Sequence, residues 1–352
     1  MSAVSDPQRL VILAEGEFGD IGSKTALGVI RYGRDVIVAV LDSTRAGRNV
    51  RDWLGERYDI PVVATLAETV PGRPTALLLG TAPAGGKLPP SWRAVVLDAM
   101  KAGLDIRSGL HTFIGDDPEF AAAARAAGVE IIDYRRPPER MEVSTGRLHL
   151  PGKKVVLTVG TDCALGKMSV ALELRKSAVE AGLPAVFVPT GQTGMMIDGW
   201  GVAVDRVISD FINGTCEWLV EQAEGMGDWI FVEGQGSLDH PAYSAVTLGL
   251  IHGCTPQAMV MVHQAGRTHH HGWEGSPQVL KPLPEFIRLH EQVAGLVAPS
   301  VVACVALNTG LLSESEARRE IARSADETGL PTDDPFRFGG ERLLDALRER
   351  LP

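Results

Sequence analysis

Residues 155–167 read Val-Val-Leu-Thr-Val-Gly-Thr-Asp-Cys-Ala-Leu-Gly-Lys, an apolar run followed by a glycine-rich turn that ends in lysine. A helical pattern over residues 168–180 follows at once. A glycine-lysine turn between a strand and a helix is typical of a phosphate-binding P-loop. Its backbone N–H groups surround the anion, and the helix N-terminus and the Lys167 ammonium add positive charge. We therefore predict an anion site at residues 160–167.

The turn departs from the usual motif, G-x-x-x-x-G-K-[S/T], at two positions. Thr161 stands where the first glycine is expected, and Met168 follows the lysine. The hydroxyl that normally follows the lysine binds Mg²⁺, whereas a thioether is a poor ligand for this hard cation. Ser169, one residue later, is the alternative magnesium ligand. We expect the cofactor-binding residues of the loop to be Gly160, Thr161, Asp162, Cys163, Gly166, Lys167, Met168 and Ser169, with Cys163 as a small filler rather than a nucleophile.

Short apolar runs alternate with helical patterns over both halves of the chain, which is typical of parallel sheets covered by helices on both faces. Adjacent prolines at 137–138 interrupt this alternation and indicate a linker. We predict an α/β fold with an N-terminal Rossmann-like parallel-sheet domain (1–140) and a C-terminal P-loop NTPase-like parallel-sheet domain (141–352). Strands are expected at 10–14, 35–41, 75–80, 105–108, 130–133, 154–159, 185–189, 229–233, 258–263 and 301–307, and helices at 22–31, 92–102, 118–127 and 168–180.

The composition excludes several classes of protein. With 45% hydrophobic and 22% charged residues, the 352-residue chain is expected to be globular and to form two domains. A formal charge of -10 offers no basic surface for nucleic acid. No apolar run approaches the ~18 residues of a membrane span, and no basic and apolar leader begins the sequence. The cysteines lack C-x-x-C spacing. We expect a cytoplasmic protein without nucleic-acid or membrane partners.

Further polar residues follow the predicted strands of the second domain, where ligands lie in open parallel sheets. Glu233 can act as a base, bind a metal or cap its strand. His263 can move protons near neutral pH or be an ordinary core histidine. Arg267 can bind a carboxylate bidentately or lie at the surface, and Asn308 can contact a purine edge.

Two further groups are less informative. The adjacent histidines at 269–271 lack the separated spacing of zinc ligands, so a metal role is not expected there. In the first domain, Lys24 and Arg45 lie after the first and second predicted strands, at Rossmann positions. No G-x-G-x-x-G accompanies them, so dinucleotide binding is not the expected role.

Together these motifs resemble a known family. Residues 160–167 and Val-Glu-Gly at 232–234 are similar to motifs of dethiobiotin synthetase. Over nearly its full length, the chain more closely resembles a bacterial and archaeal family first described as a domain of unknown function, with a Rossmann-like N-terminal domain and a P-loop C-terminal domain. The match is carried by residues 42–47, 108–111, 160–167, 191–194, 233–237 and 263–269.

Members of that family are identified as D-glutamate N-acetyltransferases of the DgcN type, which transfer acetyl from acetyl-CoA to the amine of D-glutamate. The resemblance implies this activity and acetyl-CoA as co-substrate. Coenzyme A carries phosphates but undergoes no phosphoryl transfer, which is consistent with Met168 in place of a magnesium-binding hydroxyl.

We therefore expect acetyl transfer, with Glu233 or His263 as the base and with Arg267, Arg45 and Lys24 holding the carboxylates of a small amino-acid substrate. The first alternative is an Mg-ATP-dependent ligase or kinase of the dethiobiotin-synthetase type, with Ser169 and Glu233 at the metal. The second is a non-catalytic nucleotide- or CoA-sensing protein. A homo-oligomer is expected because closed symmetric assemblies are common among soluble enzymes.

Overall fold

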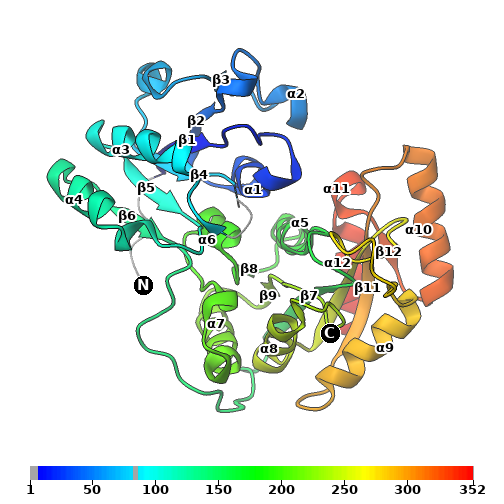
Figure 1. Cartoon of the computed structure of the whole chain (residues 1–352). Helices are drawn as coiled ribbons and strands as arrows, with labels where there is room; N and C mark the ends of the chain where they lie inside the picture. Colours follow the sequence, from blue (N-terminus) through cyan, green and yellow to red (C-terminus); the bar gives the residue numbers. More distant parts are fainter. Residues whose placement is uncertain (1–6, 82–85, 352) are drawn as a thin grey trace. The chain divides into compact units, whose positions relative to one another are not determined.

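The computed structural model describes residues 7–81 and 86–351, and the chain divides into two compact units (Figure 1). The first unit comprises Met1–Arg136 and Gln192–Ala203, and the second comprises Pro137–Gly191 and Val204–Pro352. The sequence-based boundary at residue 140 lies close to this division. The expectation that no basic and apolar leader begins the sequence rests partly on residues 1–6, which lie outside the described residues.

The first unit is built on a six-stranded parallel sheet in the Rossmann order β3-β2-β1-β4-β5-β6. The predicted strands of this half are all present, with ends that differ by a residue or so. The short strand β3 was not predicted, because two apolar residues give no detectable periodicity. The strands are β1 (Arg9–Leu13), β2 (Val36–Leu41), β3 (Val62–Val63), β4 (Ala76–Leu79), β5 (Asp105–Ser108) and β6 (Ile131–Asp133).

Helices cover this sheet on both faces. On one face, α3 and α4 bury an apolar cluster that includes Trp92, Met100 and Phe120. The predicted helix start at 117–118 is confirmed, because the Asp117 side chain accepts the first N–H groups of α4. The helices of the unit are α1 (Lys24–Tyr32), α2 (Arg51–Leu54), α3 (Arg93–Lys101), α4 (Pro118–Ala127) and α6 (Gln192–Asp198).

Helix α6 was not among the predicted helices. Residues 192–198 lie in the part of the chain assigned from the sequence to the second domain (141–352), yet they form a helix that belongs to the first unit. This helix packs against α1, and the hydroxyls of Thr193 and Thr25 form a 2.9 Å hydrogen bond. The second half of the chain thus contributes one helix to the first unit.

The second unit is also built on a six-stranded parallel sheet, in the order β12-β11-β10-β7-β9-β8. Its predicted strands are confirmed, whereas the two-residue β12 was not predicted. These results confirm the predicted α/β class, with two parallel sheets. The strands are β7 (Lys154–Gly160), β8 (Ala185–Val188), β9 (Trp229–Val232), β10 (Ala258–Gln264), β11 (Val301–Asn308) and β12 (Thr332–Asp333).

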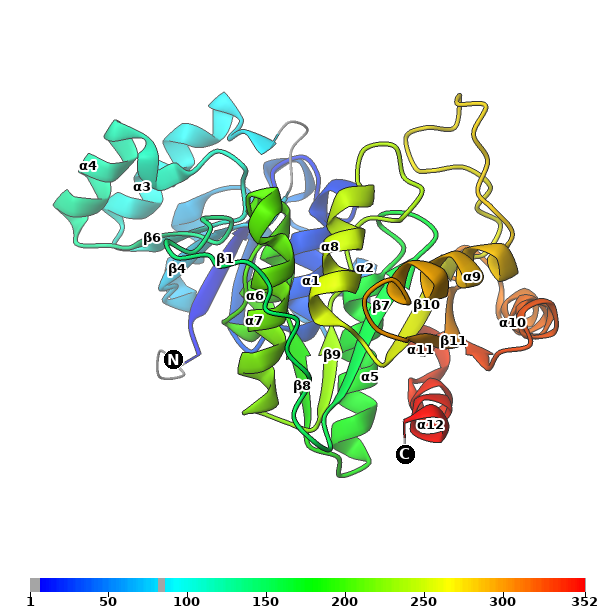
Figure 2. The same cartoon turned by 90° about the horizontal axis from the view of Figure 1, so that it is seen from below.

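Helices α5 and α12 lie against one face of this sheet, and α7, α8 and α9 lie against the other (Figure 1). Figure 2 shows a long loop, residues 265–282, that leaves the end of β10 and returns to α9. None of the helices within the described ranges has the length and hydropathy of a membrane span. The helices of the unit are α5 (Lys167–Glu180), α7 (Ile212–Glu224), α8 (Ser244–Cys254), α9 (Leu283–Ala294), α10 (Glu314–Thr328), α11 (Pro335–Phe338) and α12 (Glu341–Arg350).

Candidate functional site

The predicted P-loop connects β7 to the N-terminus of α5. Gly166 precedes the helix with a φ of 106°, a conformation that favours glycine, and α5 begins at Lys167. The Lys167 side chain is buried, and its Nζ donates a 2.6 Å hydrogen bond to the carbonyl of Asp162. The ammonium therefore spans its own loop, and a bound phosphate would replace this carbonyl as its partner.

Asp162 ties the P-loop to the long loop after β10. Its fully buried carboxylate accepts hydrogen bonds from Arg267 Nη1 at 2.6 Å, from the His271 N–H at 2.8 Å and from His270 Nδ1 at 3.2 Å. Burial by itself would raise the pKa of Asp162, but these donors outweigh it and leave the pKa below its ordinary value. Asp162 is therefore a carboxylate at neutral pH and a fixed anchor for the loop.

His240 lies beside this carboxylate, in the segment between β9 and α8. Its Nδ1 accepts a 3.1 Å hydrogen bond from the Ala242 N–H, so that nitrogen carries a lone pair. Burial, together with the charge of His270, lowers the pKa of His240, so the ring is neutral at neutral pH and its proton lies on Nε2. Nε2 is 3.9 Å from Asp162 Oδ1, too far for a hydrogen bond. A buried donor thus points toward the P-loop.

His270 links two carboxylates. Its Nδ1 contacts Asp162, and its Nε2 lies 3.4 Å from Asp239 Oδ1 without an aligned hydrogen bond. Burial raises the pKa of Asp239. The rings of His270 and His240 have centroids 4.6 Å apart. His270 therefore lies between Asp162 and Asp239, next to the His240 donor.

Asp162, Cys163 and His240 place one potential metal-ligand atom each within 4.8 Å of one another. The tautomer of His240 opposes this use. A metal-bound nitrogen needs a lone pair, and here the lone pair of the neutral ring is on Nδ1, which accepts from the backbone. The cluster therefore offers a hydrogen-bond donor rather than a metal ligand.

The two predicted bases both lie at the carboxyl edge of the second sheet. Glu233 Oε2 accepts hydrogen bonds from the N–H groups of Thr190 at 2.9 Å and Gly191 at 3.0 Å. His263 Nδ1 pairs with the Thr161 hydroxyl at 2.8 Å. Burial, followed by the charges of Arg323 and Arg267, lowers the pKa of His263 to about 4. His263 therefore contacts the P-loop, whereas Glu233 is held by the segment after β8, and the role of either residue as a base stays a prediction.

The other predicted residues of this unit mostly support the loop. Asn308 donates from Nδ2 to the Leu165 carbonyl at 3.1 Å. Ser169 directly follows Met168 on α5 and is half-buried. Its hydroxyl makes no hydrogen bond to another described residue. Arg267 also donates to Gln264 Oε1 at 2.8 Å, so its guanidinium is already held by two acceptors.

The two predicted substrate-binding residues of the first unit have different environments. Arg45 forms ion pairs with Asp20 at 2.6 Å and Asp42 at 3.1 Å, whereas Lys24 is exposed at the start of α1. Asp42 is fully buried and accepts the N–H groups of Gly16 and Phe18. It thereby joins the two loops that follow β1 and β2.

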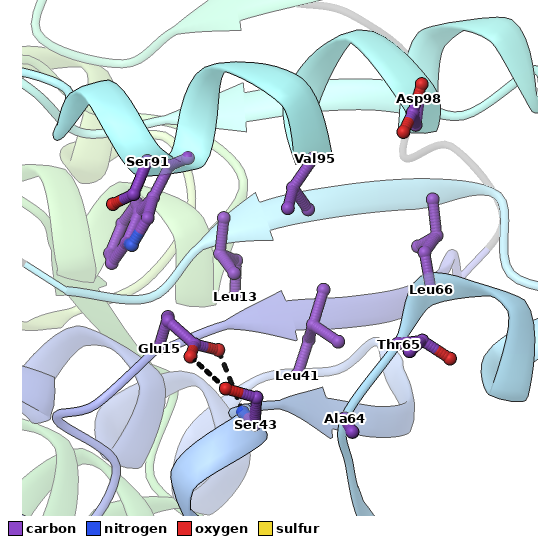
Figure 3. Close-up of a pocket in the computed structure, with 11 residues that line it drawn as sticks. Leu13, Glu15, Leu41, Ser43, Ala64, Thr65, Leu66, Ser91, Val95 and Asp98 are labelled. Carbon is purple, nitrogen blue, oxygen red and sulfur yellow. Dashed lines mark hydrogen bonds between the residues drawn. The ribbon is translucent and has the colours of Figure 1, made fainter.

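The first unit also contains a cavity of about 390 Å³ over the ends of β1 and β2 (Figure 3). Leu13, Leu41 and Val95 form its apolar floor and wall, and Glu15 accepts hydrogen bonds from the N–H and hydroxyl of Ser43 at its edge. The β3 to β4 connection beside the cavity is a 3₁₀ segment, Leu66–Gly72, and Leu66 lines the cavity.

Sequence reasoning missed His240, His270 and Asp239. His240 lies well beyond the end of β9, so the rule that ligands follow strand ends did not reach it. His270 was set aside because three adjacent histidines do not suit zinc, and a non-metal role was not considered. The available signal was the acid-histidine pair Asp239-His240 in the loop after β9.

Comparisons with known proteins agree with this architecture. A model of the DUF1611 C-terminal P-loop domain, described as a domain of unknown function, matches residues 142–344, and a model of the DUF1611 N-terminal Rossmann-like domain matches residues 43–137. A crystal structure of a DUF1611 family protein from Anabaena variabilis is 40% identical with a TM-score of 0.92, covering 97% of this chain and 99% of that chain.

Two relatives carry a functional name. A D-glutamate N-acetyltransferase of Tritonibacter scottomollicae is 35% identical over 331 residues, 93% of this chain and 94% of that protein. A D-glutamate N-acetyltransferase of Pseudoalteromonas sp. is 36% identical over 271 residues, 77% of this chain and 80% of that protein. These matches confirm the resemblance found in the sequence, and the chain belongs to the DUF1611 family.

Proposed function

We propose that this protein transfers the acetyl group of acetyl-CoA to the amine of D-glutamate. The observation that carries the proposal is the relationship, at 35% identity over 93% of the chain, to a protein named for that activity. The P-loop supports it. The loop keeps the lysine and the helix N-terminus that bind an anion, but Met168 follows Lys167 in place of the magnesium-binding hydroxyl.

In this reaction a base takes a proton from the substrate ammonium, and the free amine attacks the thioester carbonyl. The C–N bond forms as the carbonyl oxygen becomes an oxyanion. Collapse of the tetrahedral intermediate breaks the C–S bond, and the second proton of the amine nitrogen passes to the departing thiolate. The products are N-acetyl-D-glutamate and the thiol of coenzyme A. Glu233 or His263 is the proposed base, and the Nε2–H of His240 is a proposed donor to the oxyanion.

Release of free thiol tests the reaction directly. Purified full-length protein is mixed with acetyl-CoA and with D-glutamate, L-glutamate, D-aspartate or glycine, and thiol is followed with 5,5′-dithiobis(2-nitrobenzoate). We expect release that depends on enzyme and is fastest with D-glutamate. The absence of release with every amine would reject acetyl transfer.

The same preparations separate the alternatives. A ligase or kinase predicts ATP binding that requires Mg²⁺, with Ser169 and Glu233 at the metal, and a sensor predicts coenzyme A binding without turnover. Calorimetry with ATP in the presence and absence of Mg²⁺, and with coenzyme A alone, distinguishes them. Loss of coenzyme A binding in Lys167→Ala would assign the nucleotide to the P-loop.

A further inference from the structure

The first unit contains a second, smaller cavity, of about 190 Å³, on the sheet face covered by α1 and α6. It lies between the end of α1, strands β5 and β6, and the end of α6. This volume is the space of about six water molecules and is below the ~300 Å³ at which pockets for drug-sized ligands begin. The residues that line it are Arg34, Asp35, Arg107, Ile132, Tyr134, Met196 and Gly199.

Arg107 is the central residue of this cavity. It lies on β5, it is only 8% exposed, and its Nη1 donates a 3.0 Å hydrogen bond to Asp35 Oδ2. Its Nε is buried without a hydrogen-bond partner, and its Nη2 makes no hydrogen bond within residues 7–81 and 86–351. Nε has less than 1 Å² of accessible surface, so a ligand cannot reach it. The donor of this guanidinium that is left without a partner and open to the cavity is Nη2.

Asp35 does not compete for Nη2. Its Oδ2 accepts from Arg107 Nη1, and its Oδ1 accepts from the Gln8 N–H at 2.9 Å. The carboxylate therefore holds the guanidinium from one side. A buried guanidinium with unpaired donors is costly, and an anion on Nη2 would reduce that cost.

Two more donors lie at the same cavity. Arg34 has no ion pair or hydrogen bond to any residue that the structure describes, and its Nη2 lies close to Gly199, the residue after α6. The Tyr134 hydroxyl likewise has no hydrogen-bond partner in the described ranges. Burial raises the pKa of Tyr134, while the nearby positive charge of Arg107 acts in the opposite direction, so the hydroxyl is a neutral donor.

We propose that this cavity binds a small carboxylate, held by Arg107 Nη2 and by Arg34 and completed by the Tyr134 hydroxyl. Arg34 and Arg107 together outweigh the single charge of Asp35, so the cavity favours an anion. The ligand is a short mono- or dicarboxylic acid, because a nucleotide does not fit. This inference is independent of the proposed function. Two kinds of ligand are short carboxylic acids of this type: the acetyl acceptor of the proposed reaction and an acidic effector.

Calorimetric titration of the full-length protein tests the site. The probes are glutarate, D-glutamate and N-acetyl-D-glutamate, each against sodium chloride at the same ionic strength. We expect at least one acid to bind, and we expect Arg34→Gln to weaken it tenfold or more, since a charge-assisted hydrogen bond is worth about 1.5–3 kcal/mol. Arg107→Lys keeps a charge beside Asp35 but removes the fork, so it should weaken binding similarly in a folded protein.

Arg125→Gln is the matched control, because it removes an exposed arginine from α4, which does not line the cavity. Binding should be unchanged in this variant and in Lys167→Ala, whose change lies in the P-loop. A raised KM for D-glutamate in Arg34→Gln would identify the acetyl acceptor as the ligand, and an unchanged KM with lost acid binding would identify an effector. The proposal is overturned if no acid binds, or if Arg34→Gln binds acids as Arg125→Gln does.

Discussion

The backbone N–H of Ala242 sets the chemistry available to His240. By donating to Nδ1 it forces the proton of the neutral ring onto Nε2, the nitrogen that faces Asp162 and Cys163. A hydrogen-bond donor buried in this way is already oriented before a substrate arrives. Such preorganised donors stabilise an oxyanion better than water does, because they need no reorientation during the reaction.

Replacing His240 by alanine should therefore lower kcat for acetyl transfer by about 10²–10³, as the loss of one oxyanion donor does elsewhere. The KM for acetyl-CoA should change little, because the donor acts mainly in the transition state. Steady-state thiol release measures both constants. His269→Ala is the control, since the one hydrogen bond of that ring among the described residues is to the neighbouring Thr268 hydroxyl. Equal activity of the two variants would remove His240 from the mechanism.

Met168 and the His240 tautomer together predict that acetyl transfer does not depend on a divalent cation. Met168, the residue after Lys167, offers a thioether, which is a poor ligand for Mg²⁺. The neutral His240 ring directs its Nε2–H, and not a lone pair, toward the P-loop. Dialysis against EDTA should leave kcat unchanged, and added Mg²⁺ should not raise it. A rate that falls after dialysis against EDTA and returns when Mg²⁺ is added would favour the ligase or kinase alternative, in which Ser169 and Glu233 bind the metal.

At the scale of elements, the loop 265–282 and the P-loop behave as one structure because they share Asp162. Arg267, His270 and the His271 N–H all donate to that carboxylate. The loop has no regular secondary structure of its own, so these bonds are its main described attachment to the sheet edge. Disturbing the attachment should affect both loops.

The substitution Arg267→Gln should loosen the loop, because leaving the buried Asp162 without its charge partner costs about 3–5 kcal/mol of stability. The loosened loop should weaken acetyl-CoA binding. We expect faster proteolytic cleavage within residues 265–282 and a raised KM for acetyl-CoA. Arg288→Gln, an exposed change on the following helix α9, is the control. Unchanged cleavage and KM in Arg267→Gln would show that the ion pair does not hold the loop.

The strength of the local sequence signal decides which elements and site residues could be predicted. Strands such as β7 (Lys154–Gly160) were found because long apolar runs bounded by glycine are a strong local signal. Helix α6 was not predicted because its stability comes from packing on α1, and Gly194 gives it a poor helical propensity. His240 was missed because its position beside Asp162 is a tertiary contact without a spacing rule.

In the whole molecule, the two units hold different candidate sites. The second unit holds the anion loop and the histidine cluster, and the first holds the Arg107 cavity. The N-terminal unit is Rossmann-like in strand order but has a short 3₁₀ crossover after β3, so its ligand preferences need not follow that fold. Acid recognition in one unit and acyl donor recognition in the other would be consistent with a two-substrate enzyme.

Buried neutral histidines also make the second unit sensitive to acid. His290 is fully buried on α9, and burial lowers its pKa to about 4, from an ordinary value of 6.5. Between these values the unfolded chain binds a proton that the folded chain does not, so stability falls as pH falls from 6.5 to about 4 and then levels off. The full effect is roughly 3 kcal/mol, at about 1.4 kcal/mol for each pH unit.

Replacing His290 by leucine should remove about one proton from the pH dependence of the free energy of unfolding in this window. Urea unfolding across the window, with hydrogen exchange of β10 and β11 to follow the second unit, measures that slope. His263, whose pKa is also lowered to about 4, should retain its own contribution in the variant, so some slope persists. His271→Gln, which removes an exposed imidazole, is the control. If His290→Leu has the slope of the unmodified protein, the buried imidazole is not the source of acid sensitivity.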